Sequence, residues 1–101
     1  MAKFTVRVEL HAASYSDYEL LHAAMERRGF SRQIKSDEGK TYFLPTAEYD
    51  KRGDFSPEQT LDSAKAAAAE TGKRFAVLVT ESAGRKWHGL IEVGSRYAFS
   101  R

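Results

Sequence analysis

The chain has 101 residues, of which 42% are hydrophobic and 30% are charged, and its formal net charge is +2. This length fits one domain of ordinary globular composition, and so small a net charge does not by itself argue for nucleic-acid binding. The absence of cysteine excludes disulfides, thiolate metal sites and a cysteine nucleophile. No apolar run is long enough for a targeting segment or a bilayer span, so we expect a cytoplasmic protein without a membrane partner.

Residues 4–11 alternate between apolar and polar side chains. A period of two predicts a strand with one buried face and one charged face. The apolar set is Phe4, Val6, Val8 and Leu10, and the polar set is Thr5, Arg7, Glu9 and His11.

Residues 16–28 have the end signals of a helix. Ser16 can cap the N-terminus with Glu19 at the spacing of a capping box, and Gly29 follows the last turn. The period of the apolar residues predicts an inward stripe. It consists of Tyr18, Leu21 and Met25, with Leu20 and Ala24 beside them.

The middle of the chain predicts a hairpin and then a loop. Residues 31–36 and 40–44 are the two strands, because Asp37, Glu38 and Gly39 between them have turn chemistry. Residues 46–55, which include Asp50 and Asp54, predict a polar loop with solvated charges. A loop of this length is a candidate for function or mobility.

A second helix is predicted from Ser56 to Thr71, because Pro57 suits its first position. Its expected inward residues are Leu61, Ala64 and Ala68. Residues 74–81 and 86–93 then predict a final strand pair. We expect residues 1–94 to form one domain and residues 95–101 to be a flexible tail.

This order of elements predicts an α+β fold, the split βαββαβ arrangement called ferredoxin-like. Right-handed crossovers would place both helices on one face of an antiparallel sheet, with residues 4–11 in a central strand. Residues 86–93 would add an extra C-terminal strand.

The strand predicted at residues 74–81 is apolar on both faces, whereas a strand in a sheet with one solvent-exposed face should alternate between apolar and polar residues. We therefore expect a homodimer formed through residues 86–93, with Trp87, Leu90 and Val79 at the interface. Two alternatives stay open: the last strand pair curls over its own domain, or the tail folds back.

Five stretches, at residues 4–8, 14–18, 25–30, 42–45 and the second helix, resemble the GhoS family, the endoribonuclease antitoxins of type V toxin-antitoxin systems. The resemblance implies a ferredoxin-like fold, similar to a CRISPR-associated adaptation nuclease. It also implies cleavage of a toxin messenger RNA without a cofactor. That nuclease has a metal-binding aspartate where this chain has Glu9 and His11, which argues against a metal site here.

Cleavage of RNA by its own 2′-hydroxyl needs proton carriers and a cation beside the phosphate. We expect His11 and Arg28 to be the catalytic residues. The expected RNA-binding residues are Arg7, Arg27, Arg28, Arg32 and Lys35. The alternatives are a solvated strand-end histidine and a solubilising basic rim. We expect His22 to pack along the first helix and His88 to lie on a sheet surface or interface.

Two functions follow from these residues. The first is an RNA-binding regulator or cofactor-free endoribonuclease. The second is a non-enzymatic homodimer that acts as a protein-interaction module. A sensor of small ligands under the alanine-rich helix has less support, because no polar set converges there.

Overall fold

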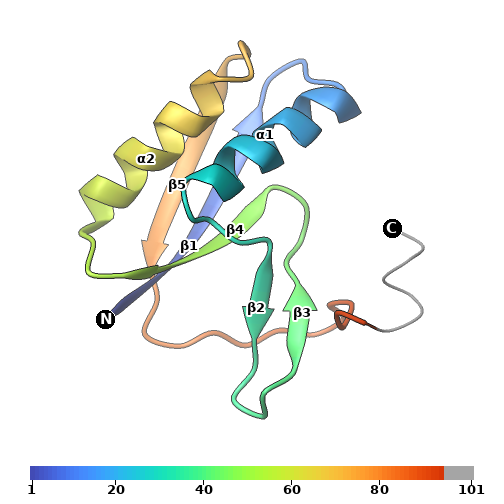
Figure 1. The fold of residues 1–101 in the computed structure, drawn as a ribbon, viewed down its shortest axis with the longest axis vertical. Helices are drawn as coiled ribbons and strands as arrows, with labels where there is room; N and C mark the ends of the chain where they lie inside the picture. Colours follow the sequence, from blue (N-terminus) through green and yellow to red (C-terminus); the bar gives the residue numbers. More distant parts are fainter. Residues whose placement is uncertain (95–101) are drawn as a thin grey trace.

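The computed structural model describes residues 1–94, which form five strands and two helices (Figure 1). The elements are β1 Ala2–Leu10, α1 Tyr15–Arg27, β2 Gln33–Lys35, β3 Thr41–Phe43, β4 Glu48–Gly53, α2 Pro57–Ala69 and β5 Phe75–Glu81. The predicted tail at residues 95–101 lies outside the described residues.

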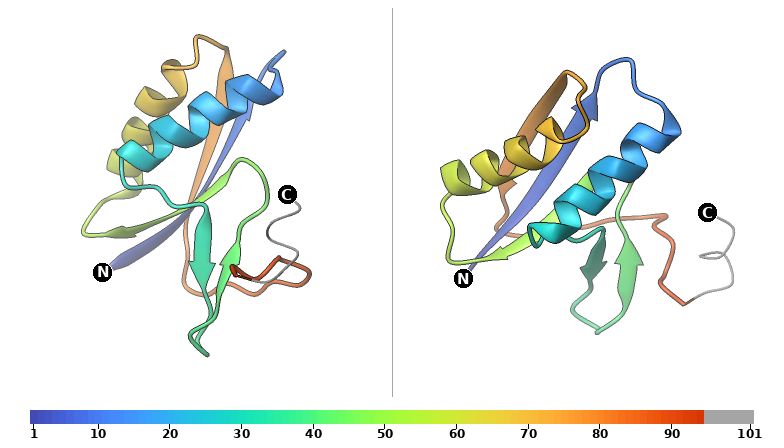
Figure 2. Two further views of the ribbon diagram at one scale, coloured as in Figure 1. Left: turned by 45° about the vertical axis from the view of Figure 1, so that its right-hand side comes forward. Right: turned by 45° about the horizontal axis from the view of Figure 1, so that its top comes forward.

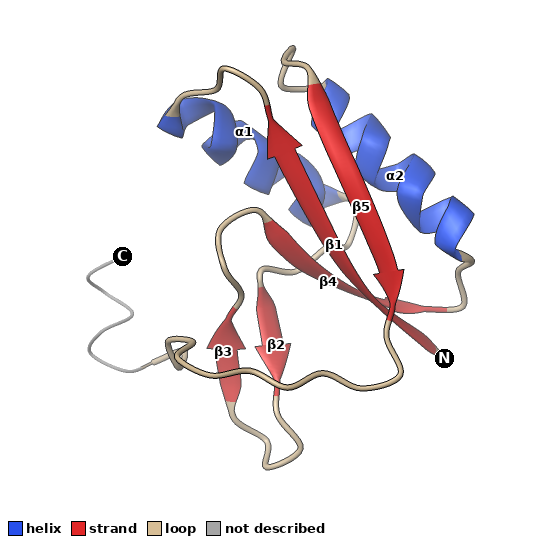
Figure 3. Ribbon diagram, turned by 180° about the vertical axis from the view of Figure 1, so that it is seen from behind, coloured by secondary structure: helices blue, strands red, loops and turns tan. Residues whose placement is uncertain are grey.

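The main sheet has the strand order β4-β1-β5, and β1 is antiparallel to both neighbours. Both helices cover the same face of this sheet, as the front and back views show (Figures 1 and 3). These observations confirm the predicted α+β, ferredoxin-like fold with a central first strand. They also define an open face, which is the side of the sheet away from the helices.

Strands β2 and β3 form a separate hairpin that projects away from the main sheet (Figure 2). Of residues 31–43, only Ser31, just before β2, pairs with β4, through two backbone hydrogen bonds of 2.9 and 2.7 Å to Asp50. The split βαββαβ arrangement has a full second strand at this position. Here that strand is reduced to one residue, and the chain continues into the projecting hairpin.

The loop predicted at residues 46–55 is wrong, because β4 occupies residues Glu48–Gly53. Only Tyr49 in this strand has a large apolar side chain, so the local pattern is too polar to indicate a strand. The strand forms because six of its residues pair with β1, and pairing of this kind overrides local propensity.

The strand predicted at residues 86–93 is also wrong. After Ser82, which donates to the Lys3 carbonyl, the chain runs without regular structure to the hairpin (Figure 3). Residues 91–93 then pair with β3, since the Ile91 carbonyl accepts from the Phe43 amide at 2.9 Å and the Val93 amide donates to the Thr41 carbonyl at 2.8 Å. We call residues 83–93 the strap. Its end is bonded to its own chain, so a dimer through a strand at residues 86–93 loses its basis.

Both helices begin with a capping box. In α1 the cap is Ser14 with Asp17, not Ser16 with Glu19, because the Asp17 carboxylate accepts from the Ser14 amide at 2.8 Å. In α2 the predicted cap Ser56 is confirmed, with its amide donating to the Gln59 side chain at 2.8 Å. Helix α1 therefore begins at Tyr15, because Asp17 stands three residues after Ser14 and closes the capping box there.

After α1, Gly29 adopts a φ of +82°, as its place after the helix predicted. Phe30 is buried directly behind it. Lys51 of β4 completes this helix end: its Nζ donates to the Arg28 carbonyl at 2.6 Å and lies 4.9 Å from the centre of the Phe30 ring. A cation at the C-terminus of a helix complements the helix dipole.

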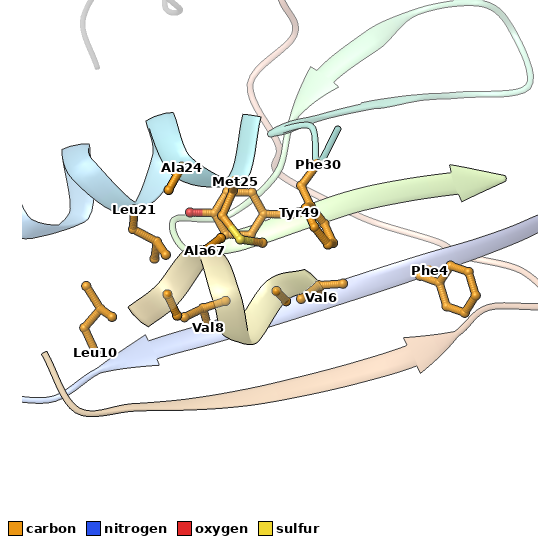
Figure 4. Packing of buried hydrophobic residues seen from close by; sticks show 12 residues of the cluster. Phe4, Val6, Val8, Leu10, Leu21, Ala24, Met25, Phe30, Tyr49 and Ala67 are labelled. Carbon is orange, nitrogen blue, oxygen red and sulfur yellow. The ribbon is translucent and has the colours of Figure 1, made fainter. Parts of the chain in front are cut away.

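The core lies between the main sheet and the helices (Figure 4). Its buried members are Phe4, Val6, Val8 and Leu10 of β1, Leu21, Ala24 and Met25 of α1, Ala64, Ala67 and Ala68 of α2, with Phe30 and Tyr49. The predicted inward residues are therefore largely confirmed. Leu20 is the exception, with 57% of its surface exposed, and Leu61 is only half-buried.

Candidate functional site

The polar side chains of β1 lie on the open face, as their alternation predicted. The strand register places Arg7 between Glu48 and Leu78. Lys3 lies opposite Arg52 on the same face. These three cations are exposed, and they share the open face with the carboxylates of Glu9, Glu48 and Asp50.

Asp50 of β4 is the anchor of a polar cluster on the open face. It is 7% exposed, so the prediction of a solvated loop charge is wrong. Its Oδ2 accepts from Arg52 Nε at 3.2 Å, and its Oδ1 lies 2.8 Å from Arg85 Nη1. The latter contact is an ion pair without hydrogen-bond geometry, and Arg85 Nη1 also donates to Thr5 Oγ1 at 3.2 Å. Arg85 therefore fixes the start of the strap to the open face by charge.

A concave pocket of about 510 Å³ opens beside this cluster, between the strap, the hairpin and the start of β1. We call it the basic pocket. Its cationic lining residues are Lys3, Lys35, Arg52, Arg85 and Lys86. Asp37 and Glu38 at the turn of the hairpin are its acidic ones.

The lysines of the basic pocket differ from its arginines in their partners. Arg52 and Arg85 are both paired with Asp50. Lys3, Lys35 and Lys86 have no ion pair within residues 1–94. The pocket therefore has three lysines without an ion pair, and its five cations outnumber the carboxylates of Asp37, Glu38 and Asp50, which suits an anionic ligand.

Two aromatic rings line the same pocket. Tyr42 of β3 and Trp87 of the strap contact each other edge to face, with their ring centroids 5.5 Å apart. Both side chains are half-buried, so each retains some surface for a ligand. Aromatic faces beside cations are the combination that single-stranded nucleic acids require.

The structure separates the predicted RNA-binding residues. Arg27 and Arg28 lie at the end of α1, where Glu70 of α2 pairs with them at 2.6 and 3.9 Å. Arg7 lies on the open face and Lys35 in the basic pocket. Arg32 lines a different hollow. The five predicted RNA-binding residues therefore occupy four places.

The two predicted catalytic residues are not brought together. His11 follows β1 near the start of α1, and Arg28 caps its other end. A helix of 13 residues separates their backbones by about 20 Å. Neither residue lines the basic pocket, so their joint catalytic role stays a prediction without a supporting contact.

The predicted interface residues also occupy different surroundings. Trp87 and Leu90 are half-buried on the strap. Val79 of β5 packs against the core on the helix side of the sheet. Its side chain therefore does not share a surface with Trp87 on the open face.

Sequence reasoning missed Lys3, Arg52, Arg85, Lys86 and Tyr42 as site residues. The run Arg85-Lys86-Trp87 was a usable signal, because two cations followed by an aromatic ring suit phosphate and base contacts. Asp50 gave no local signal, since its burial depends on β4 pairing with β1.

Within residues 1–94, no three histidine or acidic side chains come together as metal ligands. Neither α1 nor α2 has the length and hydropathy needed to cross a membrane. No model of a known protein family matches the chain, and no curated protein matches it. The resemblance to the GhoS family therefore stays a prediction.

Proposed function

We propose that this protein is a regulator that binds single-stranded RNA through the basic pocket. The observation that carries the proposal is the meeting of three unpaired lysines with the Tyr42–Trp87 pair in one concave site. Single strands are bound by positive grooves that track the phosphates and by aromatic rings on which bases stack.

The lysines and the aromatic residues of the pocket have different roles in this binding. Lys3, Lys35 and Lys86 are free to neutralise phosphates, because no carboxylate in the described part of the chain pairs with them. Tyr42 and Trp87 offer ring surface for a base. Arg7 is a further exposed cation on the open face, outside the pocket and opposite Glu48.

RNA is favoured over DNA by the GhoS resemblance, which names a toxin messenger RNA as the target. We propose binding in preference to cleavage, because none of the histidines in residues 1–94 lines the basic pocket. His11 remains available for the cleavage hypothesis only if a bound strand extends to the far end of β1.

The test is fluorescence anisotropy of a labelled 12-nucleotide RNA, titrated with the protein at several KCl concentrations. Three phosphate contacts predict a slope of log K against log salt of about −2, since each contact on a single strand contributes about −0.7. Lys35→Gln and Lys86→Gln should each weaken binding to all sequences and reduce the magnitude of the slope by about 0.7.

The matched control is Lys65→Gln, because Lys65 is exposed on α2, on the helix side of the sheet. It should leave affinity and slope unchanged. Absence of salt-dependent binding, or an equal loss in the Lys65 variant, would remove the proposal.

A second candidate function, the homodimeric interaction module, is favoured by β5. This strand forms one edge of the main sheet, and residues 75–80 contain no charge or proline to protect that edge. Leu78, at 64% exposure, lies on its open side. Antiparallel pairing of two β5 edges would join two sheets.

Sedimentation velocity over a range of protein concentrations tests this candidate. Leu78→Glu should shift a dimer to monomer, whereas Leu20→Glu, at a leucine on α1 that is 57% exposed, should not. A wild-type protein that is monomeric at all concentrations would exclude the module. RNA binding by that monomer would leave the first proposal intact.

A further inference from the structure

A second hollow, of about 380 Å³, lies where α1 meets the strand β3 and the residues that flank the hairpin. Its main lining residues are Tyr15, Tyr18, Glu19, His22, Arg32 and Phe43. We call it the aromatic pocket. It shares no lining residue with the basic pocket, and its volume is within the range of small-molecule sites.

His22 lies at the bottom of the aromatic pocket, with only 6% of its surface exposed. Its Nδ1 is 2.6 Å from the hydroxyl of Tyr49, which is fully buried. Burial raises the pKa of Tyr49, so this side chain remains a neutral phenol. The only hydrogen bond found for that hydroxyl within residues 1–94 is the one to His22.

This contact fixes the direction of the hydrogen bond. If Nδ1 donated, the Tyr49 hydroxyl proton would be buried without an acceptor, which costs about 1–3 kcal/mol. The phenol therefore donates to Nδ1, and the ring proton of His22 sits on Nε2. His22, a lining residue of the aromatic pocket, thus has one N–H donor left, at Nε2.

His22 stays neutral around pH 7. Burial lowers the pKa of His22, the charge of Arg32 lowers it further, and the charge of Glu19 partly opposes them. The groups around the ring are Glu19 and Tyr18 on its own helix, Tyr49 on β4 and Arg32 before β2. Arg32 is therefore the one cation among the lining residues of this hollow.

Arg32 has no carboxylate partner in the described part of the chain. Glu19 interacts chiefly with the neighbouring Tyr15, since hydrogen bonding to Glu19 and then its charge raise the pKa of Tyr15. The ring of Tyr15 is 81% exposed and so has no packing role. The Tyr18 hydroxyl accepts from the Leu10 amide at 3.1 Å, which holds this second ring in place.

We propose that the aromatic pocket binds a nucleoside monophosphate. The phosphate oxygens accept hydrogen bonds from the Arg32 guanidinium and from the Nε2–H of His22, since a planar guanidinium can bind two phosphate oxygens. The base lies against the Tyr15 ring, which offers an exposed aromatic face. This site is independent of the RNA proposal, because none of its residues takes part there.

Isothermal titration and NMR of the His22 imidazole test the site with three probes: AMP, adenosine and inorganic phosphate. AMP should bind, and adenosine and phosphate should each bind at least tenfold more weakly, because each lacks one half of the contact set. The His22 pKa should rise when AMP binds, since a nearby dianion favours the protonated ring.

Arg32→Gln should weaken AMP binding at least tenfold. Arg28→Gln is the control, since Arg28 is an exposed arginine four residues away and outside the hollow. His22→Phe should weaken AMP while His22→Gln, which retains an N–H donor, should weaken it less; circular dichroism checks that both fold. Equal affinity for phosphate and AMP, equal losses in the two arginine variants, or an unperturbed His22 resonance would each overturn the proposal.

Discussion

Replacement of Arg85 by glutamine is the most direct test of how the strap is held on the open face. At 2.8 Å and an effective dielectric constant of about 20, the attraction between Arg85 Nη1 and Asp50 Oδ1 amounts to roughly 6 kcal/mol. Desolvation of the two charges offsets much of this attraction. Loss of one partner from a buried pair costs about 3–5 kcal/mol. Because Arg52 stays on Asp50 Oδ2, we expect Arg85→Gln to lower the free energy of unfolding by about 2–3 kcal/mol.

The assay is urea unfolding with two probes. Far-ultraviolet circular dichroism follows the helices, and the fluorescence of Trp87, the only tryptophan, follows the strap. In a domain of this size, the expected loss in the free energy of unfolding corresponds to a decrease in Tm of roughly 10–20 °C in a thermal melt. The native-state emission of Trp87 should also shift, because its segment is no longer fixed to β4.

Arg52→Gln is the matched control. The Arg52 side chain is 38% exposed and makes one contact to Asp50, so its loss should cost less than about 1 kcal/mol. Adding Asp50→Asn to Arg85→Gln should destabilise by less than the sum of the single changes, with a coupling of about 1 kcal/mol or more. A cost of Arg85→Gln below about 0.5 kcal/mol with unchanged Trp87 emission would refute this account of the strap.

Three further predictions concern the helix layer. Gly29→Ala should lower the free energy of unfolding by about 1–2 kcal/mol, because φ is +82° and the new Cβ would lie 2.8 Å from Lys51 Nζ. Thermal melting measures this loss. Gly84→Ala is the control and should be near neutral, since a Cβ there would lie in open space. The pKa of His22 in the folded protein is below its ordinary value of 6.5, so as pH falls the unfolded chain takes up this proton first. The free energy of unfolding should therefore fall as pH drops below about 6.5. This pH dependence should shrink in His22→Gln, and equal pH profiles of the two proteins would contradict the prediction. Ala67→Leu should cost about 1–3 kcal/mol by overpacking α2, measured by urea unfolding, and an unchanged midpoint would show spare room in the core.

The sequence predicted those parts of the fold whose signals are local. Both helices were found because cap residues and apolar stripes lie within a few positions of each other, and Ser56 with Pro57 gave the start of α2. The strand β1 was found by strict alternation. These are properties that a short window of residues contains.

The errors arose where partners distant in sequence decide the structure. In β4 only Tyr49 signals burial, and the strand exists because β1 lies beside it. Trp87 and Leu90 suggested a strand, but the strap crosses to β3 and pairs only near its end.

The candidate site likewise depends on residues that are distant in sequence. Lys3, Lys35 and Lys86 are spread over the chain and meet only through the topology of sheet, hairpin and strap. Arg27 and Arg32 are close in sequence, but the end of α1 directs them to different surroundings. Proximity along the chain was therefore a poor guide to shared chemistry.

The central position of β1 has a consequence for synthesis on the ribosome. The strand made first needs β4 and β5 on its two edges, and β5 ends at Glu81. Until that residue has left the exit tunnel, the nascent chain holds an apolar strand with an unsatisfied edge. The native sheet can therefore form only after residue 81 has emerged from the ribosome.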